Sequence, residues 1–485
     1  MDPKLPKTGW WQAACTSSAT LNALGQNVVA QLVEENQVGV NNTLCKRQSN
    51  DQLMDLNLAS LGINDPRNLT KFNPIPLRKG RQQDEENSQY NEAGTESVEV
   101  LFTIPNEDNI ALLSAHSNGQ IAPVKKPKNG WPVVIFSHGI TGNRKDVLAL
   151  SSTLSMAGIA SVAIDHPLHG DRGLTDIDGK LVKIDLASVG DYLNFSSLLT
   201  ARDNARQSSA DILTLRLALN SIIDESNSVE LDTSTVHFAA HSLGSITGAV
   251  AVAIANDSMT GELSAFDHLY AFSSATLNVP ASGVPSYLLE SPYFEPLIKG
   301  PILAETSRSF RAFLAQFPTG KSMAATPPLR AAYLQFMASV SPEQSALIAA
   351  QFDAFRFSSQ TILDAADPIS YAALLGKNTH VLLQLTVGGG VNDDGSTALS
   401  DQVNPVATSL PLVGGQALAD LIGLEKVSSS QSTDGVVRFI SGDHFSLFSP
   451  EASVAATSEM QSQVASFIQL EGQGIQIGNS SVIEN

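Results

Sequence analysis

The chain has 485 residues and a formal net charge of −19 at pH 7, with 29 Lys and Arg against 48 Asp and Glu. This acidity, without any Lys/Arg cluster, excludes a nucleic-acid-binding surface. No apolar run reaches the ~18 residues that a membrane-spanning helix needs. The length leaves room for a sizeable core plus one insertion or a second small domain.

Residues 1–96 are predicted to form an N-terminal helical segment followed by a polar linker. Apolar residues at helical spacing indicate one amphipathic helix, namely Leu21, Leu24, Val28 and Leu32. Residues 81–89 are strongly polar and are typical of a solvated linker.

The two cysteines, Cys15 and Cys45, both lie in this segment. An even count fits one disulfide in an oxidising compartment, and two free thiols are the alternative. Neither cysteine has a histidine near it in the sequence, which argues against a catalytic thiol. Residues 1–11 contain no recognisable signal peptide, so a cytoplasmic chain and a mature secreted chain both remain open.

An apolar strand is predicted over Trp131–Ser137, and it ends in the loop His138–Gly142. Such a loop, after an early strand, is typical of an oxyanion-hole donor. A helix over 143–157 and a strand over 159–164 follow. His166 and His169 come directly after that strand and are expected to shape the site rather than to act as its base.

Residues 240–244, Ala-His-Ser-Leu-Gly, are predicted to form a nucleophile elbow after a long helix over 201–223. The β-branched and aromatic run 235–239 precedes the elbow as a strand, and the small-residue run 245–253 follows it as a helix. The sharp turn needs small residues at Ala240 and Gly244. This setting favours Ser242 as a nucleophile over a plain helix-capping serine.

Two backbone N–H groups are expected to form the oxyanion hole. One belongs to Leu243, and the other belongs to Ile140, with Thr141 as the alternative. Three neighbouring residues are expected to line the substrate site: His138, Gly139 and His241.

Residues 285–359 are predicted to be an inserted helical cap. After a strand predicted over 266–272, this stretch has no convincing strand and holds eight of the 19 Phe. Two apolar stripes have helical spacing: Phe310, Phe313, Leu314 and Phe317, then Tyr333, Phe336, Met337 and Val340. The enrichment favours an acyl-chain or other apolar substrate, and the alternative is a bundle that buries its own stripes. Phe313 and Phe336 are the candidates for substrate contact.

The acid is expected on the loop after a buried strand over 381–387, which a helix over 360–375 precedes. Asp393, Asp394 and Asp401 all follow that strand. The first two lie in Asn-Asp-Asp-Gly, which is also typical of a turn. Asp401 is followed by a proline-containing turn that can fix its orientation, so we assign it as the acid.

His444 is assigned as the general base because it follows the last predicted strand, 436–440, ahead of a final helix over 450–470. The order serine, acid, histidine and the alternation of strands with helices indicate an α/β-hydrolase fold. We expect a mostly parallel central sheet with helices on both faces and an inserted helical cap. Its core is predicted in two parts, 97–284 and 360–485.

No cofactor and no metal ion are expected. Gly388–Gly390 lacks the lysine and the helix of a phosphate loop. Asp176–Gly179 has the spacing of a hairpin turn rather than of a calcium loop. No Cys/His arrangement has zinc spacing.

Several stretches resemble the bacterial extracellular lipase family, which includes virulence-associated lipases, phospholipases A1 and surface lysophospholipases. They are VVIFSHGITG (133–142), AIDHPLHGDRG (163–173), the elbow with its helix start (240–248), QTILDAADPISY (360–371) and DQVNP (401–405). The resemblance covers about residues 97–470. The chain departs from the family in the absence of a signal, of a lipid-attachment cysteine and of a long β-rich N-terminal region.

The resemblance implies secretion or a cell-surface location and a lipid ester substrate. It also implies Asp401 as the acid, because the acid of the family sits in a DQV-type segment. The expected partners are therefore a small-molecule or lipid ester and, transiently, a lipid surface.

Together these residues predict a serine carboxylic-ester hydrolase, an esterase or lipase, that cleaves apolar acyl esters through an acyl-enzyme. Ser242 attacks the acyl carbonyl, His444 accepts its proton, and Asp401 orients the imidazole. A phospholipase A1, a lysophospholipase or an acyltransferase could use the same triad. A peptidase fits the apolar cap less well, and a catalytically silent binding protein is the alternative from another class.

Overall fold

The structure is a computed structural model that describes most of the chain between residues 15 and 485. The described residues are 15–16, 21, 24–49, 51, 53–61, 82–83, 90–91, 98–117, 122–175, 181–186, 188–194, 197–221, 230–316 and 326–485. Residues 1–11, most of the polar stretch 81–89, the turn 176–179 and Phe317 lie outside them.

The chain divides into two compact units. Unit 1 comprises Met1–Ser97, Leu174–Val182 and Asp191–Asn204, and unit 2 comprises Val98–Gly173, Lys183–Gly190 and Ala205–Asn485. Two helices have residues in both units, α6 (Val189–Leu193) and α7 (Leu198–Leu219).

Unit 1 has a small apolar core of Leu32, Leu56 and Leu58. Leu21, Leu24 and Val28 pack against it, as their helical spacing predicts. Its helices are α2 (Gln26–Glu34) and α3 (Asn42–Ser49). Its strands form two antiparallel pairs, β1 (Gln82–Gln83) with β2 (Tyr90–Asn91), and β6 (Leu174–Thr175) with β7 (Leu181–Val182).

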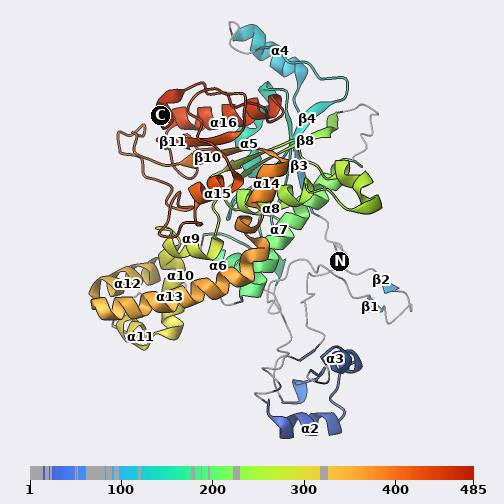
Figure 1. The fold of residues 1–485 in the computed structure, drawn as a ribbon, viewed down its shortest axis with the longest axis vertical. Coiled ribbons are helices and arrows are strands. Elements are labelled where there is room, and N and C mark those ends of the chain that lie inside the picture. The colour runs from blue at the N-terminus through green and yellow to red at the C-terminus, as the bar shows by residue number, and fades with distance from the viewer. Residues whose placement is uncertain are drawn as a thin grey trace. The chain divides into compact units, whose positions relative to one another are not determined.

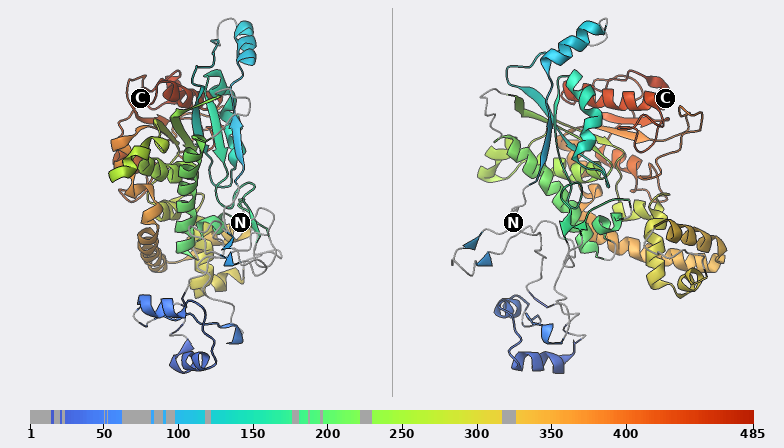
Figure 2. Two further views of the ribbon diagram at one scale, coloured as in Figure 1. Left: turned by 90° about the vertical axis from the view of Figure 1, so that its right-hand side faces the viewer. Right: turned by 180° about the vertical axis from the view of Figure 1, so that it is seen from behind.

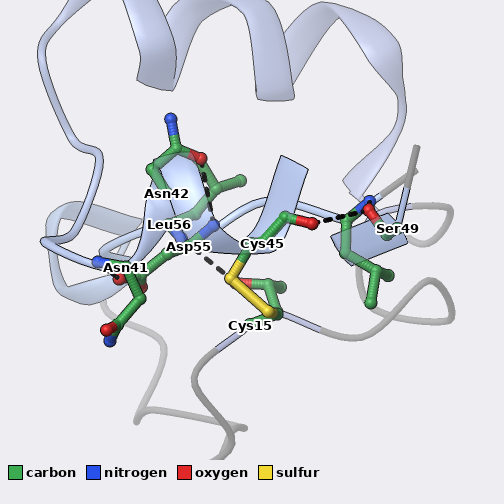
Figure 3. The surroundings of a disulfide bond; sticks show 9 residues. Cys15, Asn41, Asn42, Cys45, Ser49, Asp55 and Leu56 are labelled. Atoms are coloured by element: carbon green, nitrogen blue, oxygen red, sulfur yellow. Dashed lines mark hydrogen bonds between the residues drawn. A yellow bond between two sulfur atoms is a disulfide. The ribbon is translucent and has the colours of Figure 1, made fainter. Parts of the chain in front are cut away.

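Cys15 and Cys45 form a disulfide with Cα atoms 5.6 Å apart, so the first of the two alternatives for these cysteines is the one found (Figure 3). Hydrogen bonds surround it. The Asp55 carboxylate accepts the Asn41 N–H at 2.9 Å, and the Asp55 N–H donates to the Asn42 side chain at 3.2 Å. The disulfide therefore closes a segment that local hydrogen bonds also hold together.

Unit 2 is built on a seven-stranded sheet in the order β11-β10-β9-β8-β4-β5-β3. Every neighbouring pair is parallel except β3 with β5. The strands are β3 (Val100–Thr103), β4 (Trp131–Ser137), β5 (Ala160–Ile164), β8 (Leu231–His241), β9 (Ser274–Asn278), β10 (His380–Thr386) and β11 (Gly435–Phe439).

Helices cover both faces of this sheet because successive side chains of a strand point to opposite sides. Val133 and Ile135 of β4 face one apolar cluster, and Val134 and Phe136 face the other. The first cluster includes the end of α7 together with α8 (Leu243–Ala255), α14 (Ala372–Asn378) and α15 (Gly415–Ile422). The second includes α5 (Leu148–Met156) and α16 (Val454–Gln469). The predicted α/β-hydrolase fold is confirmed.

The strand predicted over 266–272 is wrong. Residues 261–269 form a 3₁₀ helix, and Phe266 is half exposed. The true strand, β9, begins at Ser274, after the end of the predicted strand; it lies between β8 and β10, and all of its residues are buried. Its sequence, Ser-Ala-Thr-Leu-Asn, has no apolar run because small and polar side chains are accommodated at the centre of the sheet.

Between β9 and α14, the described residues form an insertion of five helices that group together in every view (Figures 1 and 2). They are α9 (Val284–Glu290), α10 (Glu295–Thr306), α11 (Arg308–Leu314), α12 (Thr326–Ser339) and α13 (Pro342–Leu363). Outside this insertion, unit 2 also contains α4 (Glu107–His116) before β4.

Asp367 joins the two ends of the insertion. Its buried carboxylate accepts the N–H groups of Gly283 and Val284, which lie at the entry to α9. It also accepts the side-chain amide of Gln360, from the last turn of α13, at 3.0 Å. The prediction of a single helix over 360–375 is wrong, because the chain bends at Asp367. α13 ends at Leu363, and the Asp367–Pro368 bend separates it from α14.

Removing the disulfide is expected to destabilise unit 1. A loop of 30 residues is closed by the bond, and opening it in a Cys15→Ser/Cys45→Ser variant should cost about 3–4 kcal/mol. Limited proteolysis of the full chain, with and without a reductant, measures the effect. Cleavage in residues 24–61 should accelerate in the variant and in reduced wild type alike. Equal cleavage rates in oxidised wild type and variant would contradict it.

Candidate functional site

Ser242 lies at the sharp turn between β8 and α8, with φ 52° and ψ −116°. Positive φ is costly for a residue with a Cβ, so the surrounding contacts must hold this turn. The Ser242 N–H donates to the carbonyl of Asn278, at the end of β9, at 3.0 Å. The same carbonyl accepts the Ser245 hydroxyl at 2.9 Å.

The turn also depends on a close approach of two backbones. A Cβ added to Gly244 would lie 2.1 Å from the carbonyl oxygen of Ser137. A Cβ added to Gly139 would lie 2.9 Å from the His241 ring and 3.2 Å from Cβ of Ser242. The loop after β4 therefore packs directly on the elbow, and only glycine fits at Gly244.

Ser242, His444 and Asp401 form one hydrogen-bonded series. The His444 Nε2 lies 3.0 Å from the Ser242 Oγ, and the His444 Nδ1 lies 2.7 Å from the Asp401 Oδ2. All three residues are buried. Their strands end at the same edge of the sheet, which is why residues 202 positions apart meet here.

Asp401 follows the end of β10 by 15 residues, and a backbone hydrogen bond holds it against the last residue of that strand. Its own N–H donates to the Thr386 carbonyl, and its Oδ1 accepts the N–H groups of Val403 at 2.8 Å and Asn404 at 2.9 Å. These donors leave Oδ2 for His444. The two rival acids lie elsewhere: Asp393 accepts the Val454 N–H, and Asp394 accepts the Ser396 N–H within its own turn.

The two expected oxyanion donors lie on either side of the close approach described above. Leu243 is the first residue of α8, and Ile140 begins the turn that the Gly142 N–H closes on the Gly139 carbonyl at 3.1 Å. Across the described residues, neither the Leu243 N–H nor the Ile140 N–H donates to a protein group. Both are therefore available to an incoming oxygen.

His138, His166 and His169 form a buried group behind this loop, with ring centroids 4.4 to 5.9 Å apart. The His138 Nδ1 donates to the Gly139 carbonyl at 2.7 Å, and its Nε2 accepts the His166 N–H at 3.0 Å. Burial lowers the pKa of His138 to about 4 and that of His169 to about 3. These neutral rings fix the loop.

A buried ion pair secures the same loop. The Arg144 guanidinium pairs with Asp165 and, at 2.8 Å, with Asp171. The Arg144 N–H also donates to Asp165 at 2.6 Å. Burial of Asp146, which caps the following turn, raises its pKa to about 6.

The structure places the two insertion phenylalanines together. The Phe336 ring lies 4.9 Å from Phe310 and 5.5 Å from Phe313, and both Phe336 and Phe310 are buried. For Phe336 these contacts favour the alternative interpretation, a stripe that packs inside the insertion. Phe313 is partly exposed.

Sequence reasoning missed three residues at the site. Asn404 donates to the Val279 carbonyl at 2.7 Å and lies 3.4 Å from the Ser242 Oγ, and its place in the DQVNP segment was a usable signal. Asn278 binds the His241 Nδ1 at 2.8 Å, and nothing in the sequence marks it. Phe445 is half exposed beside the His444 ring, at 5.1 Å, and its position next to His444 was the signal.

Neither a metal-binding cluster nor a membrane-spanning helix is present among the described residues. Within those ranges no group of three or more His, Cys, Asp or Glu side chains is placed to hold a metal ion. Likewise, no helix in the described part of the chain has the length and apolar character that a membrane crossing requires.

By its sheet order and its elbow the chain has an α/β-hydrolase fold. Residues 127–293 match the family described as "Putative serine esterase (DUF676)", and the match spans β4, β8, the elbow and β9. The family match supports a serine ester hydrolase; it does not extend to Asp401 or His444. No curated protein matches the chain.

Solved α/β-hydrolases are similar to the chain at low identity. A structure titled "Lipase (Open form)" is 15% identical, with a TM-score of 0.37, over 77% of this chain and 94% of that chain. A Pyrobaculum calidifontis esterase is 14% identical, with a TM-score of 0.35, over 72% and 79%. A thermostable esterase from Pseudomonas putida is 14% identical, with a TM-score of 0.37, over 78% and 84%.

Acid is expected to destabilise the fold through the buried histidines. Their pKa values are lowered in the folded chain, to about 4 for His138 and about 3 for His169. The unfolded chain therefore binds more protons below pH ~6.5, and each of these histidines should remove about 1.4 kcal/mol of stability per pH unit between pH ~6.5 and its folded pKa.

Urea unfolding at a series of pH values measures this loss. His138→Asn should reduce the slope of unfolding free energy against pH, because it removes a group whose pKa is lowered in the folded chain. The same slope in wild type and His138→Asn would contradict the expected linkage.

Proposed function

We propose that the protein is a serine carboxylic-ester hydrolase of apolar acyl esters, with Ser242, His444 and Asp401 as its catalytic residues. The observation that carries this proposal is the hydrogen-bonded series Ser242 Oγ–His444 Nε2 and His444 Nδ1–Asp401 Oδ2, at 3.0 and 2.7 Å. The serine-esterase match over 127–293 supports the reaction class.

In this mechanism Ser242 Oγ attacks the acyl carbonyl while its proton passes to the His444 Nε2. Asp401 fixes the proton of His444 on Nδ1 and stabilises the imidazolium, because its Oδ2 accepts that hydrogen bond. The N–H groups of Leu243 and Ile140 stabilise the oxyanion of the tetrahedral intermediate. His444 returns the proton to the leaving alcohol, and a water that it then activates hydrolyses the acyl-enzyme.

The insertion is proposed to serve as a cap, with its first residues tied to the acid loop. The buried Ser291 hydroxyl lies 2.7 Å from the Val403 carbonyl and 3.1 Å from the Gln402 carbonyl. The Tyr293 N–H donates to the same Gln402 carbonyl at 3.0 Å. The start of the insertion thus adjoins the segment that carries Asp401, which supports a cap beside the acyl site.

An apolar acyl group is supported by exposed apolar side chains on the loops around the triad. Phe445 adjoins His444, and Leu399 precedes Asp401 by two residues; both are more than half exposed, at 52% and 64%. The resemblance to extracellular lipases and the Cys15–Cys45 disulfide together support a secreted or cell-surface location, since disulfides persist in oxidising compartments.

Removing a triad residue should abolish ester hydrolysis. Ser242→Ala and His444→Ala are each expected to lower kcat by about 10⁴-fold or more, and Asp401→Asn by about 10³- to 10⁴-fold. Hydrolysis of p-nitrophenyl esters measures this, together with labelling of Ser242 by a fluorophosphonate. Asp394→Asn is the matched control and should keep wild-type turnover. Loss of activity in that control, with Asp401→Asn active, would overturn the acid assignment.

Phe445→Ala should reduce the preference for long acyl chains. Loss of this half-exposed ring beside His444 should lower kcat/KM on a decanoate ester by about 10-fold and on an acetate ester by less than about 3-fold. Phe336→Ala is the comparison, because its buried ring should cost about 3–5 kcal/mol of stability and affect both esters alike. Equal losses on the two esters in Phe445→Ala would refute a role in acyl binding.

A further inference from the structure

A chain of buried polar side chains runs from the elbow across the sheet to α16. The His241 Nδ1 lies 2.8 Å from the Asn278 Oδ1, and the Asn278 Nδ2 lies 3.1 Å from the Gln384 Oε1. The Gln384 Nε2 lies 3.1 Å from the Gln463 Oε1, and the Gln463 Nε2 lies 2.8 Å from the Glu459 Oε1. All five residues are buried.

All hydrogen bonds of this side-chain series point the same way, because the series ends at the Glu459 carboxylate, which accepts hydrogen bonds and donates none. Glu459 is anchored by the N–H groups of Gly478 at 3.1 Å and Asn479 at 2.8 Å, so its oxygens face donors on every side. Gln463 must therefore present its Nε2 to Glu459 and its Oε1 to Gln384. Reversing either amide would set two acceptors or two donors against each other.

A second acceptor fixes the middle of the chain independently of Glu459. The Gln384 Nε2 also donates to the main-chain carbonyl of Met460 at 3.1 Å, and a carbonyl cannot donate in return. Gln384 consequently offers its Oε1 to Asn278, and Asn278 offers its Oδ1 to His241. Each step leaves one arrangement, and the last one requires a proton on the Nδ1 of His241.

The other edge of the His241 ring faces the proposed oxyanion loop. A Cβ built on Gly139 would lie 2.9 Å from its Cδ2 and 3.5 Å from its Nε2. The ring centroid lies 4.9 Å from that of His444 and 4.7 Å from that of Phe448. The titratable groups that act on His241 are His444, after β11, and His138, after β4.

We propose that the polar side chains from Asn278 to Glu459 hold the proton of the His241 ring on Nδ1 and leave its Nε2 lone pair toward the proposed oxyanion loop. His444 is then the one member of this histidine pair that becomes charged in the reaction. The tautomer of His241 follows from the hydrogen-bond geometry alone. Its consequence for catalysis rests on the proposed function. Asn278, Gln384, Gln463 and Glu459 are positioning residues that act through His241.

This control of the His241 proton matters because a second imidazolium beside His444 would oppose the proton transfer from Ser242. Burial is the main cause that lowers the pKa of His241 well below its usual range, and the nearby His444 is the second cause. The Asn278 hydrogen bond acts in the opposite direction on that pKa, so its contribution is orientation rather than neutralisation. An Nε2-protonated His241 would turn a donor, in place of a lone pair, toward the loop.

Nitrogen-15 NMR of the full chain labelled at histidine tests the tautomer directly. His241, assigned by the loss of its signals in His241→Gln, should show a protonated Nδ1 and a bare Nε2 without titrating between about pH 5 and pH 9. A protonated Nε2, or a titration midpoint inside that range, would overturn the proposal. This readout needs no turnover, so it stands apart from the proposed function: a wild type inactive on all esters would remove that function and leave the tautomer result valid.

Variants then connect the His241 tautomer to catalysis. Asn278→Leu should move the His241 proton to Nε2 and lower kcat by about 10-fold, with KM less affected. Gln384→Leu should leave His241 in a mixture of the two tautomers. Thr276→Val is the matched control, since Thr276 lies on the same strand, is buried, and has no hydrogen-bond partner for its hydroxyl among the described residues. It should keep both the wild-type tautomer and the wild-type kcat. A wild-type tautomer in Asn278→Leu would also overturn the proposal.

Discussion

The close contact between Gly244 and the main chain of Ser137 governs the geometry of the whole site. The first turn of α8 lies against the end of β4 with no room for a Cβ. Ser242 is thereby held at positive φ, and the loop that starts at His138 is brought against the elbow. This one close backbone approach therefore sets the distance between Ser242 and the loop that carries Ile140, the proposed oxyanion donor.

The polar side-chain atoms of Asp401 and of His138 each have their own set of hydrogen-bond partners. Asp401 uses one oxygen for two backbone N–H groups and the other for His444. The His138 ring holds the loop through both of its nitrogens. Because burial keeps the rings behind the loop neutral, the fold surrounds His444 with imidazoles that do not compete with it for a proton.

Those parts of the site and of the sheet that depend on a local residue pattern with a steric cause could be predicted from the sequence. The elbow could be predicted because only small residues fit at 240 and 244. β4 could be predicted because it is a continuous apolar run, and β10 because only Gln384 interrupts its apolar run. β9 could not be predicted, because a strand bonded on both sides within the sheet is defined by its partners rather than by its own five small and polar residues.

Hydrogen bonds between polar residues far apart in the sequence could not be predicted either. Asn278 and Gln384 look like ordinary strand residues until the register places them side by side. Three aspartates were available to the acid loop, and their spacing alone did not distinguish them. Asp401 differs in that its N–H pairs with the last residue of β10, a hydrogen bond that only the folded chain displays.

Asp367 gives the insertion a further property. One buried carboxylate receives both the entry to α9 and the last turn of α13, so the two ends of an excursion of five helices meet at one point. The two points at which the insertion leaves and rejoins the rest of unit 2 are therefore close together, whatever the length of the insertion. A change in the length or sequence of this segment would therefore leave the strands on either side of it in place.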